Sequence, residues 1–171
     1  MTRIPKVVES VYKIRSGAKL VLRGASKNDI WFLKEGIGAF NITRAVAWAA
    51  EHAELVEVKT DFANCAWLLR QIDLNRTHLM ALKTRYLCGE KSIIQNPLLH
   101  VAWNDDSHVL IDGHHRLALI CELRISSFLT RVIPYEEHQQ FLVYAFVREQ
   151  GQPEQEIAPG ELLKQIWGKY G

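Results

Sequence analysis

The residues best suited to chemistry in this sequence stand together in the run Asp112–Arg116, which reads Asp-Gly-His-His-Arg. A strand is expected to end at Ile111 and a helix to begin at His114, with Gly113 breaking the chain between them. The first backbone N–H groups of a helix lack internal partners and lie at the positive end of the helix dipole, so they bind anions. Glycine tolerates positive φ and lets the backbone approach a ligand. The pattern therefore predicts a phosphate site at residues 113–116.

Arg116 lies in the first turn of the expected helix, where a cation opposes the dipole by about 0.3–1 kcal/mol. A charged hydrogen bond to phosphate contributes roughly 1.5–3 kcal/mol, and a guanidinium can make two such bonds to one phosphate. A bound anion would therefore reverse the local penalty, which favours a functional role. A structural interpretation is open as well: Asp112 caps the helix, Gly113 turns the chain, and Arg116 pairs with a surface carboxylate.

The paired histidines belong to the same expected phosphate-binding set as Gly113 and Arg116. Adjacent helical side chains point about 100° apart, so His114 and His115 are not expected to chelate one metal ion together. An imidazole with its ordinary pKa near 6.5 suits the orientation or deprotonation of a water, and His115 is the candidate for that role. A plain surface role for one of the two histidines stays open.

Carboxylates are considered because phosphoryl transfer needs charge neutralisation more than covalent chemistry. Mg²⁺ usually supplies it, held by one or two carboxylates and the phosphates. Asp112 is the nearest candidate ligand and a candidate catalytic residue. Glu136, Glu137 and Asp73 each follow a predicted strand and are further candidates, Glu136 first among them. Each of these last three is more often an ordinary solvated acid or a cap.

The composition is that of an ordinary globular protein: the chain has 171 residues, of which 48% are hydrophobic and 23% charged. The formal net charge of +2 neither predicts nor excludes a nucleic-acid partner.

The three cysteines, Cys65, Cys88 and Cys121, are widely spaced and form no C-x-x-C pair, so reduced thiols are expected rather than disulfides or a zinc site. The N-terminus carries no apolar signal region and no run could cross a bilayer. A cytoplasmic protein without membrane insertion is expected.

Hydrophobic periodicity predicts the elements around the motif. The first 30 residues indicate one or two short strands or a loose hairpin. The predicted helices cover Ile42–His52, Asn75–Leu87, His114–Leu123 and Tyr135–Glu149. The predicted strands cover Glu54–Lys59, Cys65–Ile72, Pro97–Trp103, His108–Ile111 and Ser127–Ile133.

These elements indicate an α+β (α/β) fold with a small mixed sheet flanked by helices. One domain is expected over residues 1–149, with its core at about 54–149. Residues 150–160 are rich in Gln, Glu, Pro and Gly and are expected to be a linker. Residues 161–171 are expected to form a short C-terminal helix that docks or dimerises, and the oligomeric state is open. DNA is a candidate partner with thin support, because no DNA-reading motif is present and the basic residues of the second helix also suit a solvated face.

The run Val109–Ala118, followed by Glu122-Leu123 and the strand Phe128–Ile133, is similar to the G-x-x-R core of the ParB/sulfiredoxin superfamily. The upstream run Ile94–Leu99 resembles the strand that enters the same sheet there. The resemblance implies a ParB/sulfiredoxin-like fold in which this loop and helix start hold nucleotide phosphates. Arg116 then stands at the position of the phosphate-binding arginine. ATP or another nucleotide, with Mg²⁺, is the implied ligand.

Departures from the family pattern narrow the choice. Sulfiredoxins carry a cysteine where this chain has His114, so their thiol chemistry is not expected. Chromosome-segregation ParB proteins continue into a helix-turn-helix and a dimer domain, for which too few residues follow Pro134. The Asp-Gly-His-His-Arg motif is closer to the motif of small-molecule kinases of the superfamily, such as the free-serine kinase type. It is also compatible with short plasmid-borne fertility-inhibition proteins of the Osa type, a group associated with ATP hydrolysis and DNA cleavage.

The function expected from this resemblance is nucleotide binding with ATP hydrolysis, together with metal-dependent cleavage of DNA. The cellular role would be inhibition of conjugative DNA transfer through a conjugation or secretion-system protein. Two alternatives are open: a small-molecule kinase that uses the same phosphate site, and a nucleotide-gated DNA- or protein-binding module without turnover. The expected catalytic residues are Arg116, His115, Asp112 and Glu136.

Overall fold

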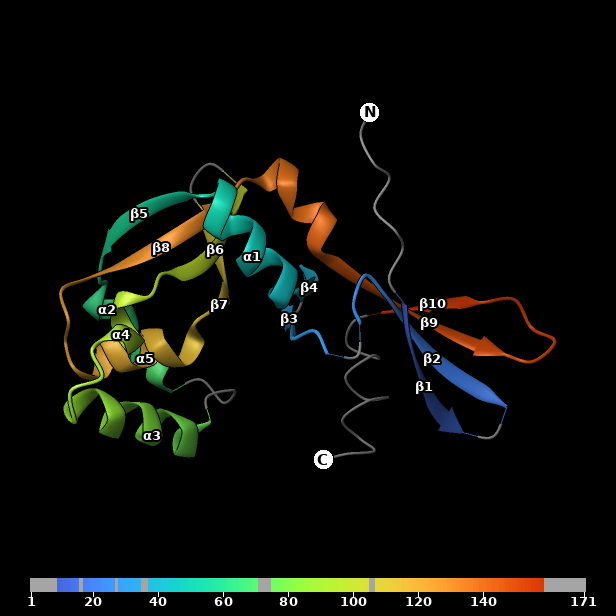
Figure 1. The fold of residues 1–171 in the computed structure, drawn as a ribbon, viewed down its shortest axis with the longest axis horizontal. Coiled ribbons are helices and arrows are strands. Elements are labelled where there is room, and N and C mark those ends of the chain that lie inside the picture. Colours follow the sequence, from blue (N-terminus) through green and yellow to red (C-terminus); the bar gives the residue numbers. More distant parts are fainter. Residues whose placement is uncertain are drawn as a thin grey trace. The chain divides into compact units, whose positions relative to one another are not determined.

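The computed structural model of the chain describes residues 9–15, 17–26, 28–34, 37–70, 75–104 and 107–158 (Figure 1). The chain divides into two compact units, residues 1–45 with 139–171 and residues 46–138. Each unit contains its own sheet, and each is described separately. The second unit carries the motif Asp112–Arg116. None of the helices in these described stretches is both long and apolar enough to span a membrane.

The first unit is built on an antiparallel sheet with the strand order β1-β2-β9-β4-β3, and β10 also pairs with β9. Its strands are β1 (Glu9–Arg15), β2 (Ala18–Arg23), β3 (Trp31–Lys34), β4 (Gly38–Asn41), β9 (Leu142–Glu149) and β10 (Gln155–Ile157). The β1–β2 hairpin confirms the pattern of the first 30 residues. Its buried cluster comprises Leu20, Leu22, Ala25, Ala39, Val143 and Ala145.

The helix predicted over Tyr135–Glu149 is wrong. Residues Tyr135–Phe141 form a 3-10 helix, η1, and the chain then enters the strand β9. The segment 142–149 is rich in β-branched and aromatic residues, which favour a strand. Pairing of β9 with β2 on one edge and with β4 and β10 on the other overrides the helical spacing. Within the expected linker, residues 155–157 form β10 instead of irregular chain.

The second unit contains a mixed sheet with the strand order β5-β8-β6-β7. Strands β6 and β8 run parallel, and the other two neighbouring pairs are antiparallel. The strands are β5 (Glu54–Lys59), β6 (Leu98–Asn104), β7 (Ser107–Asp112) and β8 (Ser127–Ile133). The sheets and helices together confirm the predicted α+β class.

The α-helices of the described residues are α1 (Ile42–His52), α2 (Phe62–Leu69), α3 (Arg76–Leu87), α4 (Ser92–Gln95) and α5 (His114–Glu122). Helix α5 packs against both α2 and α3 (Figure 1). A buried cluster fills the space among α3, α4 and α5 and comprises Leu79, Leu82, Ile93, Ala118 and Leu119. Helix α5, which begins at the motif, is therefore held along its length.

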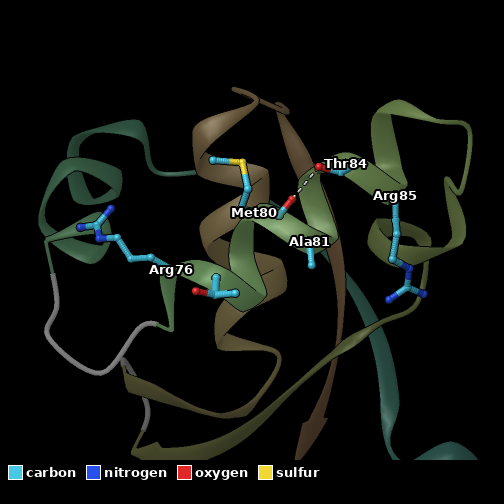
Figure 2. Close-up of a pocket in the computed structure, with 6 residues that line it drawn as sticks. Arg76, Met80, Ala81, Thr84 and Arg85 are labelled. Atoms are coloured by element: carbon cyan, nitrogen blue, oxygen red, sulfur yellow. Dashed lines mark hydrogen bonds between the residues drawn. The ribbon is translucent and has the colours of Figure 1, made fainter.

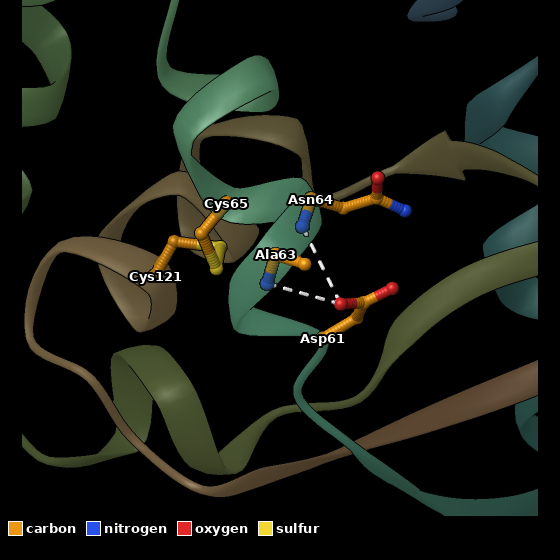
Figure 3. Close-up of a disulfide and its surroundings, with 5 residues drawn as sticks. All are labelled: Asp61, Ala63, Asn64, Cys65 and Cys121. Carbon is orange, nitrogen blue, oxygen red and sulfur yellow. Dashed lines mark hydrogen bonds between the residues drawn. A yellow bond between two sulfur atoms is a disulfide. The ribbon is translucent and has the colours of Figure 1, made fainter.

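The strand predicted over Cys65–Ile72 is also wrong, because residues Phe62–Leu69 form α2. A short apolar run does not distinguish a strand from a buried helix by periodicity alone. The carboxylate of Asp61 accepts hydrogen bonds from the backbone N–H groups of Ala63 at 3.1 Å and Asn64 at 3.4 Å, and it thereby caps the helix (Figure 3). A side-chain cap of this kind favours helix over strand at this position.

A disulfide joins Cys65 of α2 to Cys121 of α5, with the Cα atoms 5.3 Å apart (Figure 3). The prediction of reduced thiols is wrong for this pair. The two cysteines are 56 residues apart in sequence, and only the packing of α2 on α5 brings them together. Both side chains are buried. Cys88 is a free, exposed cysteine, as expected.

Candidate functional site

Gly113 forms the turn between β7 and α5 with φ of +105° and ψ of 21°. This left-handed conformation suits glycine and strains other residues. A Cβ atom at this position would lie 2.8 Å from Cγ of Leu98 and 3.2 Å from Nη2 of Arg116. Conformation and close packing on β6 therefore both require glycine, and the predicted strand–glycine–helix turn is confirmed.

The start of α5 differs from those of α1, α2 and α3. In those helices a side chain caps the first turn: Asn41, Asp61 and Asn75 each accept a hydrogen bond from a backbone N–H two or three residues further on. Gly113, the N-cap of α5, has no side chain to do so. Among the described residues Asp112 bonds only to Arg116, so it does not cap the helix. No side chain therefore caps the first turn of α5 among the described residues.

Arg116 ties the start of α5 to the chain that enters β6. Its Nη1 donates to the backbone carbonyls of Asn96 at 3.0 Å and Pro97 at 3.1 Å, and its Nη2 lies 3.4 Å from Oδ2 of Asp112. A guanidinium has five N–H donors, and these bonds use three of them. Nε–H and one Nη2 hydrogen have no acceptor among the residues that the structure describes. Arg116 thus has a structural role and retains donors for a ligand.

His115 is engaged with α3. Its Nε2 accepts a hydrogen bond of 3.0 Å from the backbone N–H of Asn75, and its ring lies edge-on to His78 with centroids 4.7 Å apart. Burial, and then the neighbouring His78, lower the pKa of His115. Acceptance at Nε2 requires the neutral ring with its proton on Nδ1. Since the only lone pair is occupied, this arrangement does not support the expected role of His115 in water activation.

His100 of β6 is the residue that sequence reasoning missed. Its Nδ1 lies 2.6 Å from Oγ1 of Thr130, and its ring centroid lies 6.4 Å from that of His108. Burial, and then the neighbouring His108 and His114, lower its pKa to about 4. The sequence offered only a partial signal: alternation along β6 places His100 on the same face as Leu98, but only the structure shows that Leu98 packs at Gly113.

The predicted acids do not gather at one point. Asp112 pairs with Leu99 near the start of β6. Glu136 is exposed on η1, whose Tyr135 lies edge-on to Trp103 near the end of β6, with centroids 5.3 Å apart. Leu99 and Trp103 are four residue steps apart along the strand, a span of about 13 Å. The structure therefore puts Glu136 at the opposite end of the sheet from Asp112.

Glu137 lies on the same 3-10 helix as Glu136, and Asp73 is outside the described residues. In the part of the chain that the structure describes, no group of three or more His, Cys, Asp or Glu side chains could hold a metal ion. Mg²⁺ commonly binds through one or two carboxylates together with ligand phosphates. Asp112 fits that pattern only as a single ligand, so Mg²⁺ would have to bind together with a phosphate ligand.

A surface hollow of about 680 Å³ lies on the outer side of α3, lined by Arg76, Thr77, Met80, Ala81, Thr84 and Arg85 (Figure 2). It contains no residue of the motif. Its two cations already have partners, since Arg76 donates to the carbonyl of Leu69 and Arg85 makes two bonds to Glu90. The start of α5 is therefore a better candidate for the functional site than this hollow.

No protein-family model matches the sequence, no curated protein matches it, and no solved structure matches the chain. The resemblance to the ParB/sulfiredoxin core rests on the motif residues and their strand–helix–strand order. The α+β class is established by the two sheets and their helices.

Proposed function

We propose that the chain binds a phosphate-bearing ligand, a nucleotide such as ATP, at the start of α5. The observation that carries the proposal is the helix start at Gly113, which has no side-chain cap whereas α1, α2 and α3 have one. A helix start without a side-chain cap, at the positive end of the helix dipole, favours an anion. The positive φ of Gly113 is the conformation that this turn needs.

The side chains around the turn support an anionic ligand. Arg116 is held by carbonyls that carry no formal charge, so among the described residues its positive charge is offset only by Asp112, across a contact of 3.4 Å. A phosphate near Nε and Nη2 would make shorter, charge-assisted hydrogen bonds. Asp112 is 38% exposed and can turn away from the guanidinium. A ligand phosphate would then compete with Asp112 for the same cation.

For the reaction, we propose ATP hydrolysis, with metal-dependent cleavage of DNA as a further activity. Mg²⁺ bound to Asp112 and the ligand phosphates would neutralise phosphate charge. Arg116 would orient the phosphate and stabilise the charge that develops on it. Inhibition of conjugative transfer in the cytoplasm, through DNA or a conjugation or secretion-system protein, is the proposed cellular role and rests on resemblance alone.

The second candidate is a nucleotide-gated binding module without turnover. It is favoured by His115, whose Nε2 is occupied by Asn75 and is therefore not available as a base. It is also favoured by the separation of Glu136 from the motif along β6. Such a module would keep the phosphate site and lack the groups that activate water.

One experiment separates these functions. The protein is incubated with ATP, Mg²⁺ and supercoiled plasmid, with Arg116→Ala as the matched control. Released phosphate and nicked plasmid support the hydrolase and nuclease. Consumption of ATP only when a small hydroxyl-bearing metabolite such as serine is added indicates the kinase. Nucleotide binding without any product indicates the module, and no binding of any nucleotide rejects the site.

A further inference from the structure

Side chains from four elements lie near one another, and one of them belongs to the start of α5. They are His100 of β6, His108 of β7, His114 of α5 and Thr130 of β8. The His100 and His108 rings are 6.4 Å apart, and His114 is close enough to affect the charge state of His100. We call these residues the histidine cluster. Leu98, two residues before His100 on β6, packs on the turn at Gly113, where a Cβ atom would lie 2.8 Å from its Cγ.

His100 is held at one ring nitrogen. Its Nδ1 is 2.6 Å from the hydroxyl of Thr130, a residue that is 1% exposed. Among the residues that the structure describes, its Nε2 has no hydrogen-bond partner. When the Thr130 hydroxyl donates to Nδ1, the proton of the neutral ring lies on Nε2, which is then a donor for a ligand. The alternative bond from Thr130 to the carbonyl of Arg131 is 3.4 Å long and weak.

The cluster fits an anion better than a metal ion. Three imidazoles could in principle ligate a transition metal, but no three such groups in the described ranges have the required geometry. Burial, and then the neighbouring imidazoles of His108 and His114, lower the pKa of His100 to about 4, so its ring is neutral near pH 7. An anion placed beside the ring would act in the opposite direction and favour its charged form. The ring would then become both a hydrogen-bond donor and a counterion.

We infer that His100 is a ligand-contacting residue of the proposed phosphate site, which donates Nε2–H to the bound anion and takes up a proton when the anion binds. This inference rests on the proposed function and adds to it a specific donor from β6 and a proton linkage. Because protonated His100 attracts the anion, the anion binds more tightly as the pH falls. Each unit by which the anion raises the pKa of His100 corresponds to about tenfold in affinity at most.

Other charged groups surround His100 and must be separated from it. On β7 these are His108 and Asp112, and on α5 they are His114 and Arg116. On β8, Arg131 follows Thr130 and points to the opposite face of the sheet, where it donates to the carbonyl of Ala53. Arg116 keeps its charge throughout the range, so the histidines and Asp112 are the groups whose titration needs controls.

The test uses sulfate as the probe, because its charge does not change between pH 5 and 8, together with ATP. Binding of each is measured by calorimetry at pH 5.5 and 8.0, in buffers of different ionisation enthalpy to count protons. We expect tighter binding and proton uptake at pH 5.5.

His100→Asn should weaken sulfate binding at pH 5.5 by about tenfold, as expected for one charged hydrogen bond, and should reduce the proton uptake. His108→Asn and His114→Asn measure the contributions of their neighbours, and the exposed His52→Asn is the matched control and should change nothing.

A measurement on the unaltered protein guards against a variant that fails to fold. Imidazole ¹⁵N NMR should find the His100 proton on Nε2 at pH 7.5, and sulfate should raise the pKa of that ring. Three results would overturn the inference without rejecting the phosphate site. They are a His100 proton on Nδ1, a His100 resonance that does not shift with sulfate, and equal proton uptake in folded His100→Asn. If neither ATP nor sulfate binds at any pH, the proposed function itself is wrong.

Discussion

His115 of α5 accepts a hydrogen bond through Nε2 from the backbone N–H of Asn75, the residue that caps α3. The helix that opens the candidate site and the helix that packs on it are therefore joined at their first turns. The same Asn75 uses its side chain to accept the N–H of His78, whose ring lies against His115. His115, the second histidine of the motif, thus links the start of α5 to the start of α3, and its Nε2 is not available for catalysis.

The lowered pKa values of two histidines predict that the stability of the protein depends on pH. The folded pKa values of His115 and His100 are lowered, so between their ordinary pKa near 6.5 and the lower folded values the unfolded chain binds protons that the folded chain does not. The stabilising contribution is complete above pH 6.5 and is lost as the pH falls toward about 4, the folded value of His100. Urea unfolding at pH 8.0, 6.5 and 5.0 should give a falling free energy.

The contribution of the hydrogen bond between His115 and Asn75 is tested with His115→Ala. At pH 8.0 this change should lower the free energy of unfolding by about 0.5–1.5 kcal/mol, as for an ordinary hydrogen bond. It should also flatten part of the decrease between pH 6.5 and 5.0, because one of the two titrating rings is gone. His52→Ala, on α1, is the matched control and should keep the full pH dependence. An unchanged pH profile in folded His115→Ala would contradict the role assigned to the ring.

Arg116→Ala should affect both stability and binding. Loss of its bonds to Asn96, Pro97 and Asp112 should lower the free energy of unfolding by about 1–3 kcal/mol, because carbonyl groups lose a charged donor. Nucleotide affinity should fall by a further 1.5–3 kcal/mol, or about ten- to a hundredfold. Chemical denaturation and calorimetry measure the two effects separately. Arg116→Lys should restore only part of each, since an ammonium lacks the planar fork. Loss of stability with unchanged affinity would leave Arg116 a purely structural residue.

Gly113→Ala should be strongly destabilising, because the new Cβ meets Leu98 at 2.8 Å in a backbone conformation that alanine avoids. We expect a loss of about 2–4 kcal/mol in the free energy of unfolding from strain and overpacking together. Gly89→Ala is a close control: its φ is +111°, and a Cβ atom at that position would have no neighbouring atom within 4 Å. It should show the conformational cost alone, about 1 kcal/mol. Equal losses in the two variants would mean that Leu98 yields at no cost.

The sequence predicts some parts of this molecule well for physical reasons. Strands β6, β7 and β8 and helix α5 are apolar runs bounded by strong turn signals, so their local preference and their final environment agree. The segments 65–72 and 135–149 fail that test, because the local pattern does not decide their structure: helix packing makes residues 62–69 a helix, and strand pairing makes residues 142–149 a strand. At the site, Gly113 and Arg116 follow from local pattern. His100 and Asn75 join it through strand pairing and helix packing, which sequence spacing does not encode.

The Cys65–Cys121 disulfide provides the last prediction. It closes a long loop, with the cysteines 56 residues apart, and it joins α2 to the end of α5 opposite the motif. Cross-linking restricts the unfolded chain, so Cys65→Ser or Cys121→Ser should lower the free energy of unfolding by about 2–4 kcal/mol. Each single variant and the double variant should lose similar amounts, because either change removes the same bond. Dithiothreitol should destabilise the unaltered protein to the same extent and leave the variants unaffected. The exposed Cys88→Ser is the control and should match the parent. Nucleotide affinity of the folded variants should be largely retained, because neither sulfur belongs to the motif. Loss of binding in a folded Cys121→Ser protein would instead show that the disulfide sets the position of the α5 start.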